Sequence, residues 1–307
     1  MADRKRTNPR KEARAAEAER HIADVERRLA PEVAASVAGI RTYGSTPASE
    51  PVLDDGAPRV PSVTVVDEDS VTAVLARGRG LASACDLAVL DFASFTSAGG
   101  GYARGAWAQE EALCAESTLY NVLATQKAWY AENRRRNINC ELYRNRALVV
   151  PRVRFDREKY HSYADVIVAA APNASRARTE YRVSDEALAE AMRGRIRLVL
   201  AVADELGHEK LVLGAFGCGV FGWDAGQVAE MFRAELASGG HVAREVVFAV
   251  PRGRFDENLE RFERAFAKFP EANADPYVPR AEREATATRA AAAAEDDEGE
   301  EDWRKYL

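Results

Sequence analysis

Beyond Pro61, short apolar runs alternate with amphipathic segments of helical period. The apolar runs read SVTVV, DLAVLDF, ALVVP, DVIVAAAP, KLVLGAF and EVVFAVP. Those at residues 86–92, 165–171 and 211–216 are apolar almost throughout, which is typical of strands covered by helices on both faces. The pattern therefore predicts an α/β fold with the layers of an α/β/α sandwich.

Amphipathic segments separate these runs. They read DSVTAVLARG, QEEALCAESTLYNVLATQ, SDEALAEAMRGRIRLVLAVADEL, DAGQVAEMFRAEL and DENLERFERAF. Several begin with Asp or Ser, the residues that cap helix N-termini. We expect each of these segments to form a helix that packs on one face of the sheet.

Three regions follow from the composition along the chain. Residues 1–60 are expected to be an N-terminal accessory segment: a solvated helix at residues 17–29, interrupted by Pro31, and then a linker rich in turn formers at residues 44–61. Residues 61–270 are the predicted catalytic domain. Residues 271–307 contain few large apolar side chains, so we expect a disordered acidic tail.

Charge and length limit the class of protein. The chain has 307 residues, 47% of them hydrophobic and 30% charged, as in ordinary soluble globular proteins. Its net charge of −6 originates in the tail, where the run EDDEGEED ends at Asp302, so the rest is close to neutral. A neutral body argues against general binding of duplex nucleic acid.

Membrane and metal chemistry have little support in the sequence. No apolar run approaches the roughly 18 residues of a membrane span, and the first residues lack the apolar core of a signal peptide, so we expect a cytoplasmic protein. The four cysteines and four histidines lack the spacings of zinc sites or of a disulfide framework. We therefore predict neither a metal nor a cofactor.

The densest chemical signal is the segment LDFASFTSAGGGYARGAWAQEEALC at residues 90–114. It predicts a buried strand, a loop with Gly99, Gly100 and Gly101 in succession, and then a helix. Because glycine lacks a Cβ and tolerates positive φ, backbone N–H groups of such a loop can converge on a ligand. A tight connection between strand and helix is the alternative explanation.

Gln109, Glu110 and Glu111 open the helix that follows this loop. Acidic residues in a first helical turn commonly complement the helix dipole and do nothing else. Here, however, two adjacent carboxylates follow a glycine loop, and neighbouring like charges raise the pKa of one of them, which suits a general acid. Successive helical positions diverge by about 100°, so one of the two would face the reacting atom.

A second glycine segment, LVLGAFGCGVFGWDAGQVAEMF, begins at Leu211. Gly217, Gly219 and Gly222 formally match the dinucleotide-binding pattern G-x-G-x-x-G. That fold needs an acidic residue after the next strand, whereas EVVFAVPR ends in Pro and Arg, and too little chain remains for its further strands. The loop still suits a diphosphate, held by backbone amides and a helix N-terminus.

Together, the two segments resemble the poly(ADP-ribose) glycohydrolases, in particular the compact bacterial-type enzymes built on a macrodomain. The family's GGG loop followed by QEE is matched by residues 99–101 and 109–111, and its G-A-x-G-C-G-V-F loop by residues 214–221. The resemblance extends over residues 61–269. It implies a macrodomain-like three-layer sandwich with a mixed central sheet.

The resemblance also implies an activity: hydrolysis of ribose–ribose glycosidic bonds in poly(ADP-ribose), or in ADP-ribosylated protein that carries the polymer, with release of ADP-ribose. Glu111 would be the general acid and then base, and Glu110 would orient the distal ribose. The loop of residues 99–101 would hold the distal ribose and phosphates, and Gln109 of the motif would be a further ligand-binding residue. The diphosphate loop would contribute Gly217, Cys218, Gly219, Val220 and Phe221, with Phe221 against a ribose or, alternatively, in the core.

Two residues depart from the bacterial pattern. Asp91 replaces the usual Asn before Phe-Ala-Ser, and Ala98 replaces the Pro before the triple glycine. The acidic run at residues 67–69 is a candidate for the adenine site by its position, with solvated loop acids as the alternative. Two other functions stay open: a non-catalytic ADP-ribose reader, and a hydrolase of mono-ADP-ribosyl linkages.

Overall fold

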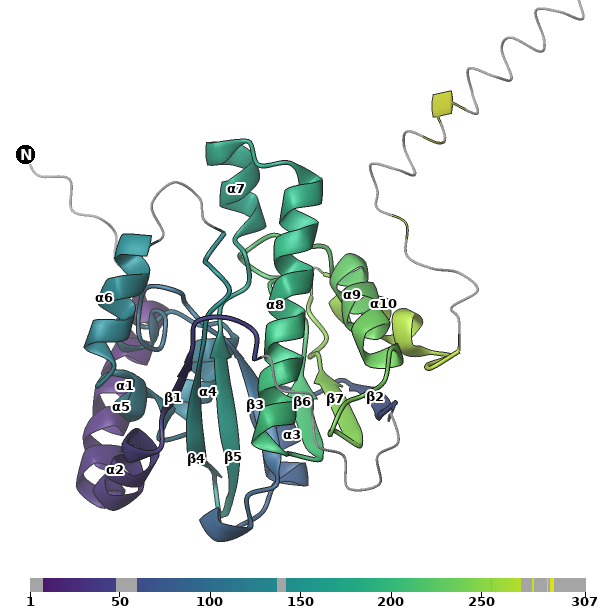
Figure 1. Ribbon diagram of the computed structural model, residues 1–307. Coiled ribbons are helices and arrows are strands. Elements are labelled where there is room, and N and C mark those ends of the chain that lie inside the picture. The colour runs from purple at the N-terminus through teal and green to yellow at the C-terminus, as the bar shows by residue number, and fades with distance from the viewer. Residues whose placement is uncertain are drawn as a thin grey trace, which may run out of the picture.

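The computed structural model describes residues 8–47, 60–136, 142–254 and 256–271, with positions 278, 286, 288 and 289. Seven strands form one sheet in the order β1-β4-β5-β3-β6-β7-β2 (Figure 1). Most of the predicted acidic tail, residues 271–307, lies outside the described residues. Among the described helices, none is both long and apolar enough to cross a membrane.

The sheet is mixed, as expected. Its five strands β5, β3, β6, β7 and β2 run parallel, whereas β4 is antiparallel to β5 and β1 is antiparallel to β4. The strands are β1 Arg41–Tyr43, β2 Ser62–Val66, β3 Leu87–Phe92, β4 Ala147–Arg157, β5 Tyr160–Ala169, β6 Lys210–Leu213 and β7 Glu245–Ala249.

The helices begin where the sequence supplies capping side chains. Asp69, Ser184 and Asp224 each accept a hydrogen bond from a backbone N–H of the helix that follows, as an N-cap does. The helices are α1 Pro9–Arg28, α2 Ala30–Ala38, α3 Ser70–Arg77, α4 Gln109–Ala115, α5 Leu119–Leu123, α6 Lys127–Arg136, α7 Ala174–Tyr181, α8 Asp185–Leu206, α9 Ala225–Ala237 and α10 Asn258–Phe266, with 3-10 turns η1 Ala82–Ala84 and η2 Tyr102–Arg104.

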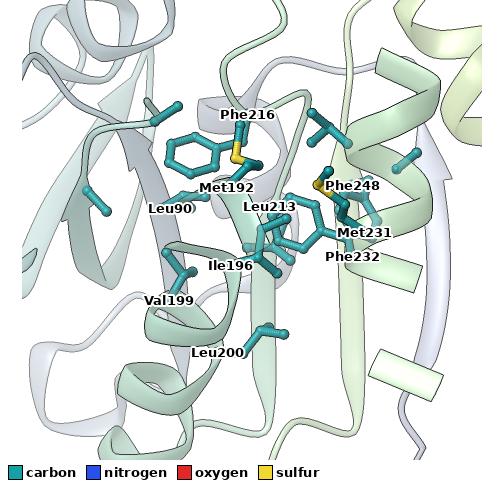
Figure 2. Packing of buried hydrophobic residues seen from close by; sticks show 14 of the residues in the cluster. Leu90, Met192, Ile196, Val199, Leu200, Leu213, Phe216, Met231, Phe232 and Phe248 are labelled. Carbon is teal, nitrogen blue, oxygen red and sulfur yellow. The ribbon is translucent and has the colours of Figure 1, made fainter. Parts of the chain in front are cut away.

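Two apolar clusters lie on opposite faces of the sheet. Successive residues of a strand point to opposite faces, so Ala88 and Leu90 of β3 join one cluster while Leu87 and Val89 join the other. The first cluster packs under α8, α9 and α10, where the ring of Phe248 contacts those of Phe232, Phe262 and Phe266. Figure 2 shows Phe232 beside Phe248. The second packs under α3, α4 and α5. The predicted three-layer α/β/α architecture is confirmed.

The sheet includes one strand that the sequence pattern did not indicate. Strand β1 lies within residues 1–60, and its Arg41 pairs with Val149 of β4. Three residues, two of them polar, are too short for a recognisable strand pattern. The sheet thus takes a strand from the segment assigned to an accessory region, and the division into domains stays a prediction.

Helix α1 is not simply solvated, contrary to expectation, because one side of it is buried against the body of the protein. Ala18 and Val25 are almost inaccessible to solvent. Tyr102 shares a hydrogen bond of 3.0 Å with Nδ1 of His21. A Cβ at Gly105, whose φ is +72°, would lie 1.9 Å from the carbonyl oxygen of Lys11. The helix therefore supports the loop between β3 and α4.

We predict that Gly105→Ala destabilises the protein far more than Gly207→Ala. Both glycines have a left-handed φ, +72° and +76°, so each substitution costs about 1–2 kcal/mol in backbone strain. A Cβ at Gly207 meets nothing within 4 Å, whereas one at Gly105 collides with α1. We expect a further loss of about 1–3 kcal/mol for Gly105→Ala in urea unfolding. Equal losses of unfolding free energy in the two variants would show that α1 does not pack closely against this loop.

Candidate active site

The two glycine loops meet at one edge of the sheet. Strand β3 leads to α4 on one face, and its neighbour β6 leads to α9 on the other face. Such a divergence opens a crevice at the carboxyl ends of parallel strands, where ligands bind in open α/β sheets. Contact between the strand ends is close: a Cβ at Gly214 would lie 2.9 Å from the Phe92 ring.

The first loop is shaped by glycines that no other residue could replace without strain. Gly99 and Gly100 have φ values of +60° and +59°. A Cβ at Gly100 would lie 2.5 Å from Oε1 of Glu111 and 2.8 Å from Oε2 of Glu110. The missing side chain thus lets both carboxyl groups approach the loop backbone. Ala98, the departure before these glycines, packs against the apolar cluster beneath them.

Glu110 and Glu111 lie in the first turn of α4 and are 3% and 6% exposed. The Gly101 N–H donates to Oε1 of Glu111 over 2.8 Å, and the Ser94 N–H donates to Oε2 of Glu110 over 2.7 Å. Burial raises the pKa of Glu110 well above its ordinary value, and the neighbouring Asp91 adds to this. The structure therefore brings the two predicted carboxylates together at the glycine loop.

Asp91 adds a third carboxyl group to this cluster. It is the penultimate residue of β3 and is inaccessible to solvent. Neither of its carboxylate oxygens has a hydrogen-bond partner among the described residues. Burial raises the pKa of Asp91 well above its ordinary value, and the charge of Glu111 raises it further. Because an unpaired buried carboxylate is costly, Asp91 favours its neutral form.

Gln109 fastens the start of α4 to the end of β3. Its Oε1 accepts from the Phe92 N–H over 2.8 Å, and its Nε2 donates to the Leu90 carbonyl over 2.9 Å and to Ser70 over 3.2 Å. These contacts satisfy the side-chain amide within the protein. The predicted ligand-binding role of Gln109 stays a prediction, while the structure shows that the residue positions the two glutamates that follow it.

The backbone N–H groups of the triple glycine are largely used inside the protein. The Gly100 N–H donates to the Ser97 carbonyl over 3.1 Å, and the Gly101 N–H donates to Glu111. We had expected these groups to converge on a ligand. Gly99, Gly100 and Gly101 instead allow close approach and hold a carboxylate, and any contact that they make with a ligand stays a prediction.

The second loop, between β6 and α9, differs in this respect. Within the described part of the chain, the backbone N–H groups of Gly217, Gly219, Val220 and Phe221 donate no hydrogen bond. Gly219 and Val220 are exposed, and a Cβ at Gly219 would meet nothing within 4 Å. Four unsatisfied donors in one exposed turn suit an anionic ligand. The α9 N-terminus contributes less than expected, because Asp224 already accepts from two of its N–H groups.

The thiol of Cys218 is occupied within the protein. Its thiol is directed to the Phe216 carbonyl, 3.7 Å away, and burial raises its pKa above the ordinary value. Cys85 and Cys114 are also free thiols, and Cys140 lies outside the described residues. No group of three or more His, Cys, Asp or Glu side chains in the described ranges is arranged to hold a metal ion.

A row of aromatic rings links the two loops. Phe95, from the first loop, stacks on Tyr143 with ring centroids 5.0 Å apart, and Tyr143 lies 5.8 Å from Phe221 of the second loop. Phe221 also packs against the core, as its alternative interpretation stated. The sequence did not indicate Phe95 and Tyr143 as site residues, because neither belongs to a recognisable motif or spacing.

A buried arginine holds the turn that carries Tyr143. The guanidinium of Arg195, on α8, donates to the carbonyl oxygens of Tyr143 and Arg144 and to Oδ1 of Asn145. No described carboxylate pairs with it, and burial alone lowers its pKa to about 9. Leu142 and Tyr143 both have positive φ, at 51° and 55°. Hydrogen bonds to Arg195 therefore stabilise a strained turn.

The acidic run at residues 67–69 is occupied by contacts within the protein. Asp69 caps α3 and pairs with Arg157, and Glu68 pairs with Arg77. Asp67 accepts from the backbone N–H of Arg252 over 2.7 Å. These contacts give each of the three acidic side chains a structural role. Their role in the adenine site stays a prediction.

Comparisons with known proteins point to one family. Residues 11–158 match the model for "Microbial-type PARG, catalytic domain". The chain is similar to the poly(ADP-ribose) glycohydrolase (PARG) structure from Thermomonospora curvata, with 32% identity and a TM-score of 0.70 over 83% of this chain and 100% of that one. No curated protein matches.

Two ligand complexes are among the similar structures. One is the T. curvata enzyme bound to the inhibitor ADP-HPD, with 32% identity and a TM-score of 0.69 over 83% of this chain and 100% of that one. The other is PARG from Deinococcus radiodurans in complex with ADP-ribose, with 32% identity and a TM-score of 0.65 over 77% of this chain and 98% of that one.

The buried carboxyl cluster predicts a specific pH dependence of stability. The pKa of an Asp side chain in an unfolded chain is about 3.9. The pKa of Asp91 in the folded protein is higher, so this residue keeps its proton to higher pH when the chain is folded. Between these pKa values the folded state binds more protons, so the free energy of unfolding falls as pH rises. Asp91→Asn removes the contribution of Asp91 to this dependence. The plot of unfolding free energy against pH should therefore become shallower by up to about 1.4 kcal/mol per pH unit.

Urea unfolding from pH 4 to 8 measures these slopes. Glu263→Gln, at an exposed position on α10, is the matched control and should keep the parent slope. The interpretation fails if Asp91→Asn and the parent lose stability in parallel across this range.

Proposed function

The chain belongs to the microbial-type poly(ADP-ribose) glycohydrolase family and is a glycoside hydrolase acting on poly(ADP-ribose), and we propose that Glu111 is its general acid and base. The observation that carries this assignment is the geometry of one carboxyl group. Oε1 of Glu111 is fixed by the Gly101 N–H, while Oε2 makes no hydrogen bond within the described residues and is not among the fully enclosed atoms. One oxygen is positioned by the loop, and the other is available to substrate.

A general acid needs a proton to donate, and two neighbouring carboxyl groups retain protons close to Glu111. Burial raises the pKa values of both Asp91 and Glu110 well above their ordinary values. In Asp91 the charge of Glu111 adds to this effect, and in Glu110 the charge of Asp91 does.

In the proposed reaction, Glu111 donates its proton to the ribose oxygen that leaves while the C–O glycosidic bond breaks. The distal ribose carbon develops oxocarbenium character. A water molecule then attacks that carbon and returns a proton to the Glu111 carboxylate, which restores the starting state. The products are ADP-ribose and a polymer one unit shorter.

Glu110 and the first loop orient the distal ribose in this scheme. Glu110 has one oxygen held by the Ser94 N–H, and its Oε1 has no described partner. That oxygen is enclosed by the protein, and leaving it without a partner is costly, so the distal ribose must expose it before a hydroxyl can donate to it. Gln109 fixes both glutamates by its contacts with β3.

The second loop binds the diphosphate in the proposed complex. Four N–H groups of residues 217–221 that donate to no described residue supply the donors, and Phe221 lies against the sugar through its place in the aromatic row. Complexes of the similar enzymes with ADP-HPD and with ADP-ribose support a site of this ligand class. A macrodomain relationship, ADP-ribosylated protein as the natural substrate and a cytoplasmic location remain predictions from the sequence.

Glu111→Gln tests the catalytic assignment. The amide keeps the size of the side chain but has no acidic proton, so release of ADP-ribose from defined poly(ADP-ribose) should fall by about a thousandfold or more. Binding of ADP-ribose, measured by calorimetry, should persist. Glu190→Gln, at an exposed position on α8, should leave both quantities unchanged.

Retained release by Glu111→Gln would contradict the assigned role. If the parent binds ADP-ribose and releases none from the polymer, the chain is instead a reader or acts on another ADP-ribosyl linkage; a panel of mono-ADP-ribosyl substrates separates those two.

Gly219→Val tests the diphosphate loop. Because a Cβ at Gly219 meets no atom within 4 Å, the variant should fold with the parent's stability. The added side chain obstructs the exposed N–H groups, so the Kd for ADP-ribose should rise about tenfold or more. Gly194→Val, where a Cβ is equally uncrowded, controls for the substitution itself. An unchanged Kd would place the diphosphate elsewhere.

A further inference from the structure

An exposed tryptophan stands beside the proposed active site. Trp107 is 55% exposed and lies just before α4 begins at Gln109. The guanidinium carbon of Arg14, on α1, lies 5.4 Å from the centre of its ring. Arg14 covers one part of the indole, and the large exposed fraction leaves the rest open to a ligand. A tryptophan that contributes so little to the core is a feature of binding surfaces.

The position of Trp107 relative to the catalytic groups follows from the chain. Four peptide units separate it from Glu111, which limits the Cα separation to about 15 Å. Arg104, in the same loop, donates to the Gly100 carbonyl over 3.1 Å, and Gly100 faces both glutamates. Trp107 and Arg104 therefore belong to the loop that adjoins the two glutamates rather than to a remote patch.

Basic side chains outnumber acidic ones around Trp107. The first turns of α1 carry Arg10, Lys11 and Arg14, with the acids Glu12 and Glu17, and the backbone of this helix contacts the loop at Gly105. The N-terminus of a helix adds partial positive charge at the same end. Poly(ADP-ribose) carries two phosphate charges in each unit, so this surface complements the polymer in charge.

The chemistry of the substrate places an adenine close to this loop. The oxygen that leaves belongs to the adenosine ribose of the preceding ADP-ribose unit, so an adenine is attached to the very sugar that departs. Nothing in the two glycine loops accounts for this second adenosine, because those loops are assigned to the distal unit. A base stacked on an aromatic side chain contributes about 1–3 kcal/mol.

On the basis of the proposed function, we propose that Trp107, with Arg14 and Arg104, forms a subsite for the leaving adenosine diphosphate unit of the polymer. The indole stacks on the adenine of that unit, and the two guanidinium groups attract its phosphates. The subsite raises kcat/KM for polymer and leaves the affinity for free ADP-ribose, which fills only the distal position, unchanged.

Trp107→Ala and Trp107→Phe test the subsite on the full chain. With poly(ADP-ribose) of defined length, kcat/KM should fall about tenfold for Trp107→Ala, and Trp107→Phe should recover most of the loss because it retains a ring. The Kd for ADP-ribose should be the same in all three proteins. Tyr160→Ala, which removes a 74% exposed ring from the β4–β5 hairpin, is the matched control and should behave as the parent does.

The outcomes separate this inference from the proposed function. Failure of the parent to release ADP-ribose would overturn the function itself and, with it, the subsite. Release by the parent with an unchanged kcat/KM for Trp107→Ala would overturn the subsite alone. An equal loss of ADP-ribose affinity in Trp107→Ala would also overturn it, because the residue would then shape the distal pocket.

Discussion

Burial of three carboxyl groups at the end of β3 is the constraint on which the rest of the site depends. An ionised carboxylate in such a place is costly unless it is hydrogen-bonded or protonated. The chain uses both solutions: backbone N–H groups hold Glu110 and Glu111, while Asp91 favours its proton. These N–H groups reach the carboxylates only because Gly100 has no side chain, and the strained loop is supported from below by α1.

Local sequence patterns made much of the fold and of the carboxyl cluster predictable. The order of strands and helices follows from runs of apolar residues, because burial of a strand on both faces leaves a direct trace in the sequence. The glycine loop and the two glutamates are close in sequence, so their proximity in space needed only a strand, a turn and the start of a helix. The same motif singled out Gln109 as a site residue. In the structure its side-chain amide is hydrogen-bonded to β3 and is not free for a ligand.

Contacts between distant segments could not be predicted in this way. Arg195 lies in the middle of an amphipathic helix, where an arginine ordinarily reaches solvent, and only the fold places it beneath the turn of Tyr143. Strand β1 is too short to show a period and exists because β4 offers it an edge. The opposite use of backbone N–H groups in the two glycine loops also cannot be read from the sequence, since both loops are simply rich in glycine.

That opposite use agrees with the different roles proposed for the two loops. The first loop directs N–H groups at the protein's own carboxylates, whereas in the second loop four N–H groups donate to no described residue. The loops follow adjacent parallel strands but lead to helices on opposite faces, so each is fixed by a different apolar cluster. A substitution in one apolar cluster is therefore expected to alter the conformation of one loop more than that of the other. Among the described residues, the aromatic row from Phe95 to Phe221 joins the two loops directly, so in the proposed reaction it is the physical connection between the loop assigned to the diphosphate and the loop that positions Glu111.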